Sequence, residues 1–168
     1  HLQYRGILRT ADPFVTPALE RIEVDYDPVL VARQVKDVRA PETVRKGEPT
    51  VVTVSATIEV GADNYGVDRL RLEGTCLDVT AVRLDGMPLE HDEDLGQGYR
   101  WTCFPALEQT LIEFSQHDRI SAGTVRVEVE GEGLFLHDLV PIQVQIASDE
   151  QATRDGYTNW QNGPAIAV

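Results

Sequence analysis

The stretch TVVTVSATIEV (residues 50–60) alternates apolar and polar residues without interruption. Successive side chains of a β-strand point to opposite faces, so this period of two predicts a strand with one face in the core and one in water. The apolar face of the strand would carry Val52, Val54, Ala56, Ile58 and Val60. The stretch therefore indicates a sheet that is buried on one side.

The same period recurs along the chain. Clear strands are expected at 20–26 and 124–131, and weaker ones at 29–38, 67–74, 77–84, 99–104, 109–114, 132–138 and 140–147. Turn-forming residues separate them at 46–49, 61–66, 85–86, 96–98, 122–123 and 131–133. Strands spaced by roughly 8–12 residues, with a turn at each break, are typical of antiparallel sandwiches and barrels. We predict an all-β fold, an antiparallel immunoglobulin-like or jelly-roll β-sandwich.

Two local patterns bear on this assignment. Asp85-Gly86 lies between two apolar-containing arms, and this dipeptide is the strongest short-range hairpin signal in a sequence, so we expect a structural turn there. Residues 106–116 are the best helix candidate, since Leu107, Leu111 and Phe114 recur at helical spacing. Residues 110–114 also read as a strand, and we favour the strand.

Composition and charge narrow the range of partners. The chain has 168 residues, of which 42% are hydrophobic, and this length suffices for one domain with its own core. No apolar run approaches the length of a membrane-spanning helix, so no direct membrane span is expected. The 15 basic and 28 acidic residues give a formal charge of −13, which would repel a nucleic-acid backbone. We therefore expect no nucleic-acid partner.

The two cysteines, Cys76 and Cys103, both fall in strand-like stretches. In an oxidising compartment they would bridge neighbouring strands, and the alternative is a pair of small buried thiols. Their spacing does not fit a redox CxxC motif, and two cysteines alone do not build a structural zinc site. The pair is therefore a disulfide candidate.

A proline-containing break at 25–29 divides the chain, because the residue before a proline is biased toward extended backbone. We expect residues 1–26 to be the terminal strands of a preceding β domain or a pairing arm, since two strands alone are marginally stable. Residues 27–147 would form the β-sandwich domain, and 148–168 a polar C-terminal tail. Because His1 already precedes a strand-like stretch, we expect the chain to be the C-terminal part of a longer exported polypeptide.

The N-terminal stretch also carries a resemblance to a known family. Its pattern consists of Gln3, Tyr4, Arg5, Asp12, Pro13, Val15, Thr16, Pro17, Leu19, Val24 and Tyr26. This pattern resembles the closing strands of discoidin-like (galactose-binding-like) jelly-roll domains in secreted bacterial proteins. The remainder resembles the immunoglobulin-like and fibronectin-type modules that follow such domains. The resemblance implies an extracellular or periplasmic location, and no ligand-binding residue carries over because the sugar-binding loops would precede residue 1.

Two acidic stretches are candidates for calcium, the only cofactor that the sequence suggests. Asp63 and Asp68 flank a glycine in one stretch, and Asp92 and Asp94 lie in the other, beside His91 and Glu93. Oxygen ligands of this kind suit calcium. The alternatives are a tight turn for the first stretch and a solvated hairpin end for the second, and the spacing of an EF-hand is absent.

Other residues are candidates for contacts with partners. The expected edge strands would present Tyr4, Ile22, Val24 and Tyr26 to another chain. The C-terminal segment adds Tyr157 and Trp160, aromatic residues that contribute large contact areas.

Three functions follow, in order of preference. The first is a non-catalytic exported β-sandwich that acts as a structural or interaction module and contacts other protein chains of a larger assembly. The second is a carbohydrate-binding module with Tyr65, Tyr157 or Trp160 as stacking platforms. The third is an enzyme, although the sequence contains no recognisable catalytic motif. The histidines are scattered, and no nucleophile-elbow motif surrounds Ser55, Ser115, Ser121 or Ser148.

Overall fold

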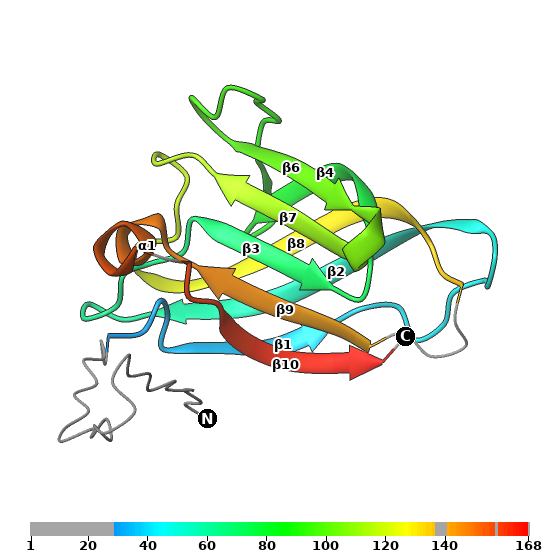
Figure 1. Cartoon of the computed structure of the whole chain (residues 1–168), viewed down its shortest axis with the longest axis horizontal. Coiled ribbons are helices and arrows are strands. Elements are labelled where there is room, and N and C mark those ends of the chain that lie inside the picture. The colour runs from blue at the N-terminus through cyan, green and yellow to red at the C-terminus, as the bar shows by residue number, and fades with distance from the viewer. Residues whose placement is uncertain (1–28, 137–140, 157, 168) are drawn as a thin grey trace, which may run out of the picture.

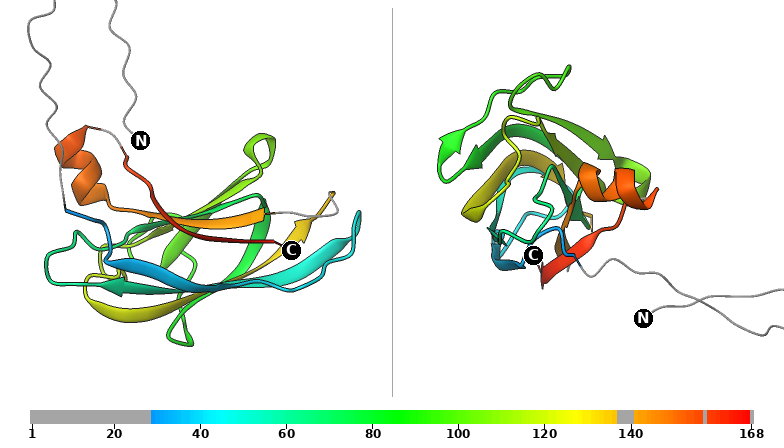
Figure 2. Two further views of the ribbon diagram at one scale, coloured as in Figure 1. Left: turned by 90° about the horizontal axis from the view of Figure 1, so that it is seen from below. Right: turned by 90° about the vertical axis from the view of Figure 1, so that its left-hand side faces the viewer.

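Two β-sheets pack face to face in the computed structural model, which describes residues 29–136, 141–156 and 158–167 (Figures 1 and 2). Within these residues each sheet has five strands, and every neighbouring pair is antiparallel. The first sheet has the order β1 (Gln34–Arg39), β2 (Pro49–Val60), β8 (Gly123–Leu134), β4 (Leu77–Leu84) and β5 (Met87–Pro88). The second has the order β10 (Gln161–Ala167), β9 (Pro141–Ala147), β3 (Arg69–Glu73), β7 (Gln109–Phe114) and β6 (Tyr99–Phe104). The predicted all-β antiparallel sandwich is confirmed.

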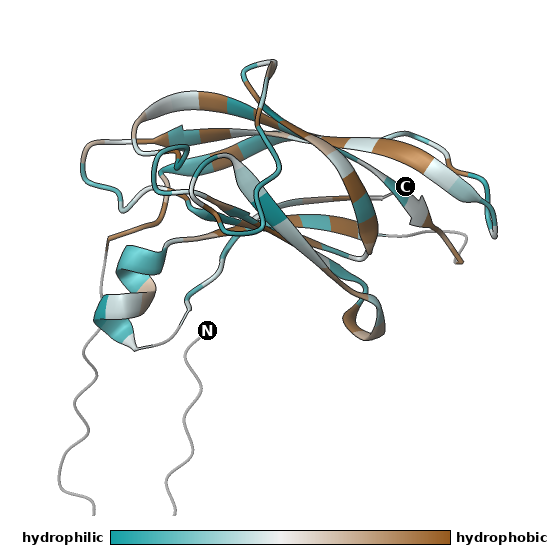
Figure 3. Cartoon of the chain, turned by 90° about the horizontal axis from the view of Figure 1, so that it is seen from above, coloured by the Kyte–Doolittle hydropathy of each residue, from teal (hydrophilic) through white to brown (hydrophobic). Residues whose placement is uncertain are grey.

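The longest ladder joins β2 to β8, with partners in register from Pro49↔Leu134 to Val60↔Gly123. The alternating stretch at residues 50–60 lies in this ladder, and its five apolar residues are each at most 3% exposed. Alternation of this kind appears as hydrophobic bands along the strands in Figure 3. The period of two therefore predicted both the strand and its buried face correctly.

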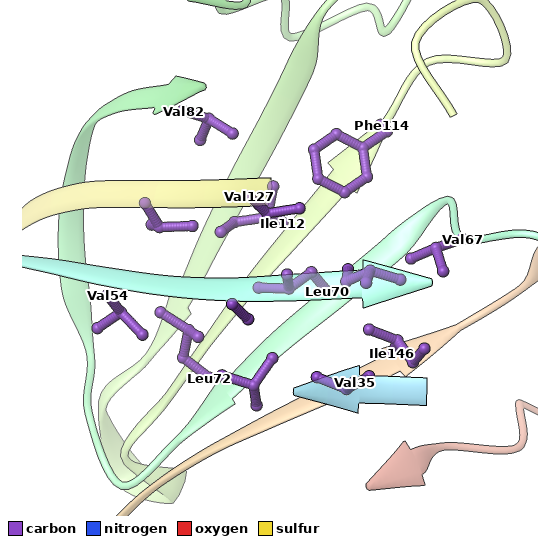
Figure 4. Close-up of a cluster of buried hydrophobic side chains, with 14 of the residues drawn as sticks. Val35, Val54, Val67, Leu70, Leu72, Val82, Ile112, Phe114, Val127 and Ile146 are labelled. Carbon is purple, nitrogen blue, oxygen red and sulfur yellow. The ribbon is translucent and has the colours of Figure 1, made fainter. Parts of the chain in front are cut away.

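The core fills the space between the sheets. Val54 and Val127 of the first sheet meet Leu70, Leu72 and Ile112 of the second, and their side chains point toward one another in Figure 4. All five are at most 2% exposed. Full burial of one such side chain stabilises the fold by about 1.5–3 kcal/mol, so this shared core is the main reason the sheets stay together.

Strand β8 is longer than expected, because the glycines at 131–133 do not form a turn. Gly131 and Gly133 face the core and continue the strand to Leu134. A Cβ at Gly131 would lie 2.8 Å from the carbonyl oxygen of Asp78, and a Cβ at Gly133 would lie 2.7 Å from a methyl group of Leu77. The glycines allow β4 to approach β8 closely. Close approach of another backbone is one reason for glycine inside a strand.

The structure confirms both local predictions, the turn at Asp85-Gly86 and the strand at 110–114. Asp85 and Gly86 form the turn between β4 and β5 with positive φ angles of 50° and 80°. Residues 105–107 form a short 3-10 helix, η1 (Pro105–Leu107), and the following residues form β7 rather than an α-helix. The strand interpretation of 110–114 is therefore confirmed.

The C-terminal segment differs from the expected polar tail. It contains helix α1 (Asp149–Asp155) and strand β10, and β10 pairs with β9 as an edge of the second sheet. The register of the β10–β9 pair shifts between Asn162 and Ala165. Pro164 lies in this irregularity, where its missing N–H group interrupts no ladder hydrogen bond. The sandwich thus extends beyond residue 147 to Ala167, because this segment completes a sheet.

Residues 1–26 lie outside the described residues, and with them Tyr4, Ile22, Val24 and Tyr26. The described chain begins at Val29, close to α1 (Figure 1). Among the helices that the structure describes, none is both long and apolar enough to cross a membrane.

The glycine contact between β8 and β4 gives a stability prediction. Gly131→Ala places a methyl group against the backbone of β4, 2.8 Å from Asp78 O and 3.1 Å from Val79 Cα. We expect the free energy of unfolding to fall by about 1–3 kcal/mol, as in other overpacked cores. Urea unfolding followed by circular dichroism measures this change.

Glu132→Ala is the matched control, because Glu132 is the exposed neighbour on the same strand. It should change the stability by less than about 0.5 kcal/mol. A Gly131→Ala variant as stable as this control would show that β4 and β8 do not need the close approach.

Candidate functional site

Cys76 and Cys103 close the side of the sandwich between β4 and β6. Cys76 lies just before β4 and Cys103 lies on β6, and the structure pairs them as a disulfide with their Cα atoms 5.3 Å apart. The buried hydroxyl of Thr110 adds a second tie, since it accepts from Leu77 N at 2.8 Å and donates to Thr75 O at 3.1 Å. The two sheets are therefore held together at this side of the sandwich.

An exposed apolar surface lies beside the disulfide. We define it by Phe104, Leu107, Leu134 and Leu136, which are 40%, 62%, 56% and 57% exposed. A cavity of about 330 Å³ opens beside two of them, lined by Leu134 and Leu136 together with Cys76, Pro105 and Glu108. Exposed apolar groups beside a hollow are typical of interaction sites.

Sequence reasoning missed this surface, although a signal was present. Leu134 and Leu136 alternate with Phe135, which is 2% exposed and belongs to the core. A strand with one wet face would carry polar residues at the two leucine positions. Apolar residues on both faces of a strand end therefore indicate a second apolar contact outside the domain core.

The first calcium candidate has a structural role in the fold. Asp68 is 1% exposed, and its carboxylate oxygens accept hydrogen bonds from Asp149 N at 2.8 and 3.0 Å, at the beginning of α1. Burial raises the pKa of Asp68 to about 6, and the nearby Asp149 carboxylate also raises it, while the hydrogen bond from Asp149 N and the cations Arg119 and Arg69 oppose the shift. Asp63 is exposed. Asp68 therefore anchors α1 to the sandwich.

The second calcium candidate shapes its own loop. The carboxylate of Asp92 accepts hydrogen bonds from the backbone N–H groups of Asp94, Gly96 and Gln97 at 2.9–3.1 Å. These bonds, the one from Gln97 first, lower the pKa of Asp92. Across the part of the chain that the structure describes, no three His, Cys, Asp or Glu side chains are grouped to hold a metal ion. Calcium at Asp63, Asp68, Asp92 or Asp94 stays a prediction from sequence.

The predicted stacking aromatics have different surroundings. Tyr65 lies under Arg154 of α1, whose guanidinium carbon is 6.0 Å from the ring centroid and which also donates to the phenol oxygen. Trp160 lies just before β10, with the guanidinium carbon of Arg71 4.2 Å from its ring centroid. Tyr157 is outside the described residues. Trp160 is thus placed beside the second sheet.

The outer face of the second sheet carries a polar network around Arg71. Gln145 accepts from Arg71 Nε at 2.6 Å and donates to Glu73 at 3.0 Å and to Asn162 at 2.8 Å. Arg71 also pairs with Glu73 at 3.2 Å. These contacts come from β3, β9 and β10, so tertiary structure alone brings the residues together. The network holds Arg71, and through it Trp160, in a fixed position.

Comparison with known proteins gives one fold-level result. No protein-family model matches the sequence, and no curated protein matches it. Among solved structures, the chain is similar to the N-terminal domain of the Streptococcus gordonii adhesin Sgo0707, with a TM-score of 0.55 and 10% sequence identity. The match covers 83% of this chain and 33% of the adhesin chain, so this chain spans about a third of that length. The likeness shows a shared β-sandwich fold.

The Cys76–Cys103 pair leads to a prediction. Intact-mass measurement of unreduced protein should show two hydrogens fewer than the reduced chain, with no thiol open to alkylation. Cys76→Ser together with Cys103→Ser should lower the stability by about 3 kcal/mol, the expected effect for a loop of this length. Free thiols in freshly purified protein would contradict the bridge.

Asp68 should make stability depend on pH. Its folded pKa of about 6 exceeds the unfolded value of 3.8, so the folded protein holds a proton that the unfolded chain releases. The stability from protonated Asp68 is present below the unfolded pKa and is lost as pH rises through about 6. Asp68→Asn removes this titration, so the Tm of the variant minus that of the wild type should rise between about pH 4 and about pH 7.

Asp63→Asn, at an exposed position, controls for the general loss of one negative charge. Thermal unfolding of the three proteins across the pH series provides the comparison. If the Asp68→Asn difference follows the Asp63→Asn difference at every pH, Asp68 is not a buried titrating group.

Proposed function

We propose that this chain is a non-catalytic binding module of an extracellular or periplasmic assembly, and that it contacts another protein chain through the apolar surface. The observation that carries the proposal is this surface itself, with four exposed apolar side chains, of which Leu134 and Leu136 line a cavity of about 330 Å³. A cavity among exposed apolar groups suits an apolar anchor residue of a partner, which is the usual arrangement at an interface hot spot.

Three further features support the proposal. The fold is shared with an adhesin domain, a protein class that acts by binding. The disulfide favours an oxidising compartment. Three of the four candidate serines, Ser55, Ser115 and Ser148, are only 6%, 1% and 1% exposed, so their hydroxyls are poorly placed to meet a substrate, whereas Ser121 is exposed. The discoidin-like and immunoglobulin-like resemblances stay predictions.

The rigidity of the apolar surface is part of the argument. Phe104 and Leu107 follow the disulfide-bonded Cys103, and Leu134 ends the long β2–β8 ladder. A surface on rigid elements loses little conformational freedom on binding, and this preserves affinity. We therefore expect the free and bound forms to have the same backbone here.

Site-specific photo-crosslinking in the cells that naturally produce the protein tests the proposal. A benzoylphenylalanine probe in place of Leu107 or of Leu134 should give a covalent adduct with the same partner chain. Met87, which is 70% exposed and apolar but lies on β5 outside this surface, is the matched control position. The control probe should give no such adduct.

A second measurement follows once the partner has been captured by this route. Leu134→Ser should weaken its binding by about thirtyfold, the effect of losing one hot-spot residue. The Tm should change little, since this side chain is already exposed. Equal crosslinking from all three probe positions, or none from positions 107 and 134, would contradict the proposal.

A further inference from the structure

A second cavity lies at the end of the sandwich where the described chain begins. Its walls come from residues 29–31, from Gln151 of α1 and from residues 159–161, which lead into β10. Its volume is about 200 Å³. Helix α1 and the beginning of the described chain lie together at this end (Figures 1 and 2), whereas the apolar surface lies where β6 and β8 end. The two sites are therefore separate.

Gln151 is the polar side chain that the fold leaves unsatisfied in this cavity. The residue is 2% exposed, and its Oε1 atom accepts no hydrogen bond from any residue that the structure describes. A buried acceptor without a donor destabilises the folded state, so native proteins rarely keep one without a purpose. Oε1 itself is sealed from solvent, so a hydroxyl or N–H group of a ligand in the cavity would supply the missing donor once the Gln151 side chain rotates toward it.

Trp160 forms another wall of the cavity, and its position is fixed. Arg71 occupies one face of the indole, 4.2 Å from the ring centroid, and Arg71 is itself held by Gln145 and Glu73. A ligand in the cavity would stack on the opposite face of the indole. A fixed aromatic ring offers contact area at a low loss of conformational freedom.

The chemistry of the walls defines the class of ligand. Val29, Leu30 and Val31 are aliphatic, and the other lining residues that the structure describes are amides and one indole, so none of these is charged. A phosphate or carboxylate ligand would find no cation among these lining residues, since Arg71 lies against the other face of Trp160, and a purely apolar ligand would leave Gln151 Oε1 unsatisfied. Drug-sized ligands occupy pockets of about 300–1,000 Å³, so this smaller cavity suits a single ring.

We propose that this cavity binds one neutral sugar residue, which stacks a C–H face on Trp160 and donates a hydroxyl hydrogen bond to Oε1 of Gln151. The exposed amide of Asn159 stands at the rim for a further hydroxyl group. This site goes beyond the proposed protein contact, because it uses different residues in a different place. It also gives the carbohydrate-binding alternative from the sequence a defined location.

The test uses the full chain and four separate probes: glucose, galactose, mannose and N-acetylglucosamine. Saturation-transfer NMR detects binding of each sugar at millimolar concentration, and tryptophan fluorescence reports on the site. Because the chain has two tryptophans, fluorescence is measured in a Trp101→Phe background. We expect at least one sugar to bind and to change the emission of Trp160.

Two variants assign the site. Trp160→Ala should abolish binding, and Trp160→Phe should restore part of it. Gln151→Met keeps the size of the side chain and removes the unsatisfied acceptor, so it should weaken binding by about tenfold while the Tm stays equal or rises. Leu134→Ser, on the apolar surface, should bind sugar as the wild type does.

The outcomes separate this site from the proposed protein contact. Loss of sugar binding in the Trp160→Ala and Gln151→Met variants, with crosslinking at positions 107 and 134 unchanged, supports the sugar site alone. No binding of any of the four sugars, or binding that both variants retain, overturns it. Neither result changes the expectation for the apolar surface.

Discussion

The β2–β8 ladder is the constraint on which the rest of the structure depends. These two strands pair over their full length, and each carries another strand on its outer side, β1 on β2 and β4 on β8. The inward face of β2 forms one wall of the core. On β8 the inward face changes from valines to Gly131 and Gly133, where β4 comes close. One ladder thus sets both the length of the sandwich and the approach of its neighbouring strands.

The two sides of the sandwich are closed by different means. Between β1 and β10, the side-chain amide of Gln161 accepts from Ala32 N at 3.1 Å and donates to Ala32 O at 2.8 Å. Between β4 and β6, the Cys76–Cys103 bridge has this role. The two candidate binding sites adjoin these closures, the sugar cavity beside Gln161 and the apolar surface beside Cys103. Each is therefore built on a rigid part of the fold, as binding requires.

Sequence patterns succeeded where one physical effect dominated and failed where two competed. Alternation predicted β2, and Asp85-Gly86 predicted a hairpin, because pleat geometry and positive φ leave few alternatives. The glycines at 131–133 were interpreted as a turn, yet they serve close packing. Strand β10 was missed because Gly163 and Pro164 are poor strand formers, and its pairing with β9 decides its structure. Local propensity was overruled there by a tertiary partner.

The sequence by itself determined the class of fold, the buried face of the alternating strands at 50–60 and 124–131, and the two cysteines available for a bridge. Only the tertiary structure decided where Asp68, Arg71 and Gln151 act. Asp68 reaches the beginning of α1, 81 positions along the chain, and Arg71 meets Gln145, 74 positions along. Periodicity describes which face a residue takes, whereas a binding site depends on which distant residues share that face. The order in which distant strands pair sets this second property, and the alternation within one strand does not specify its partner.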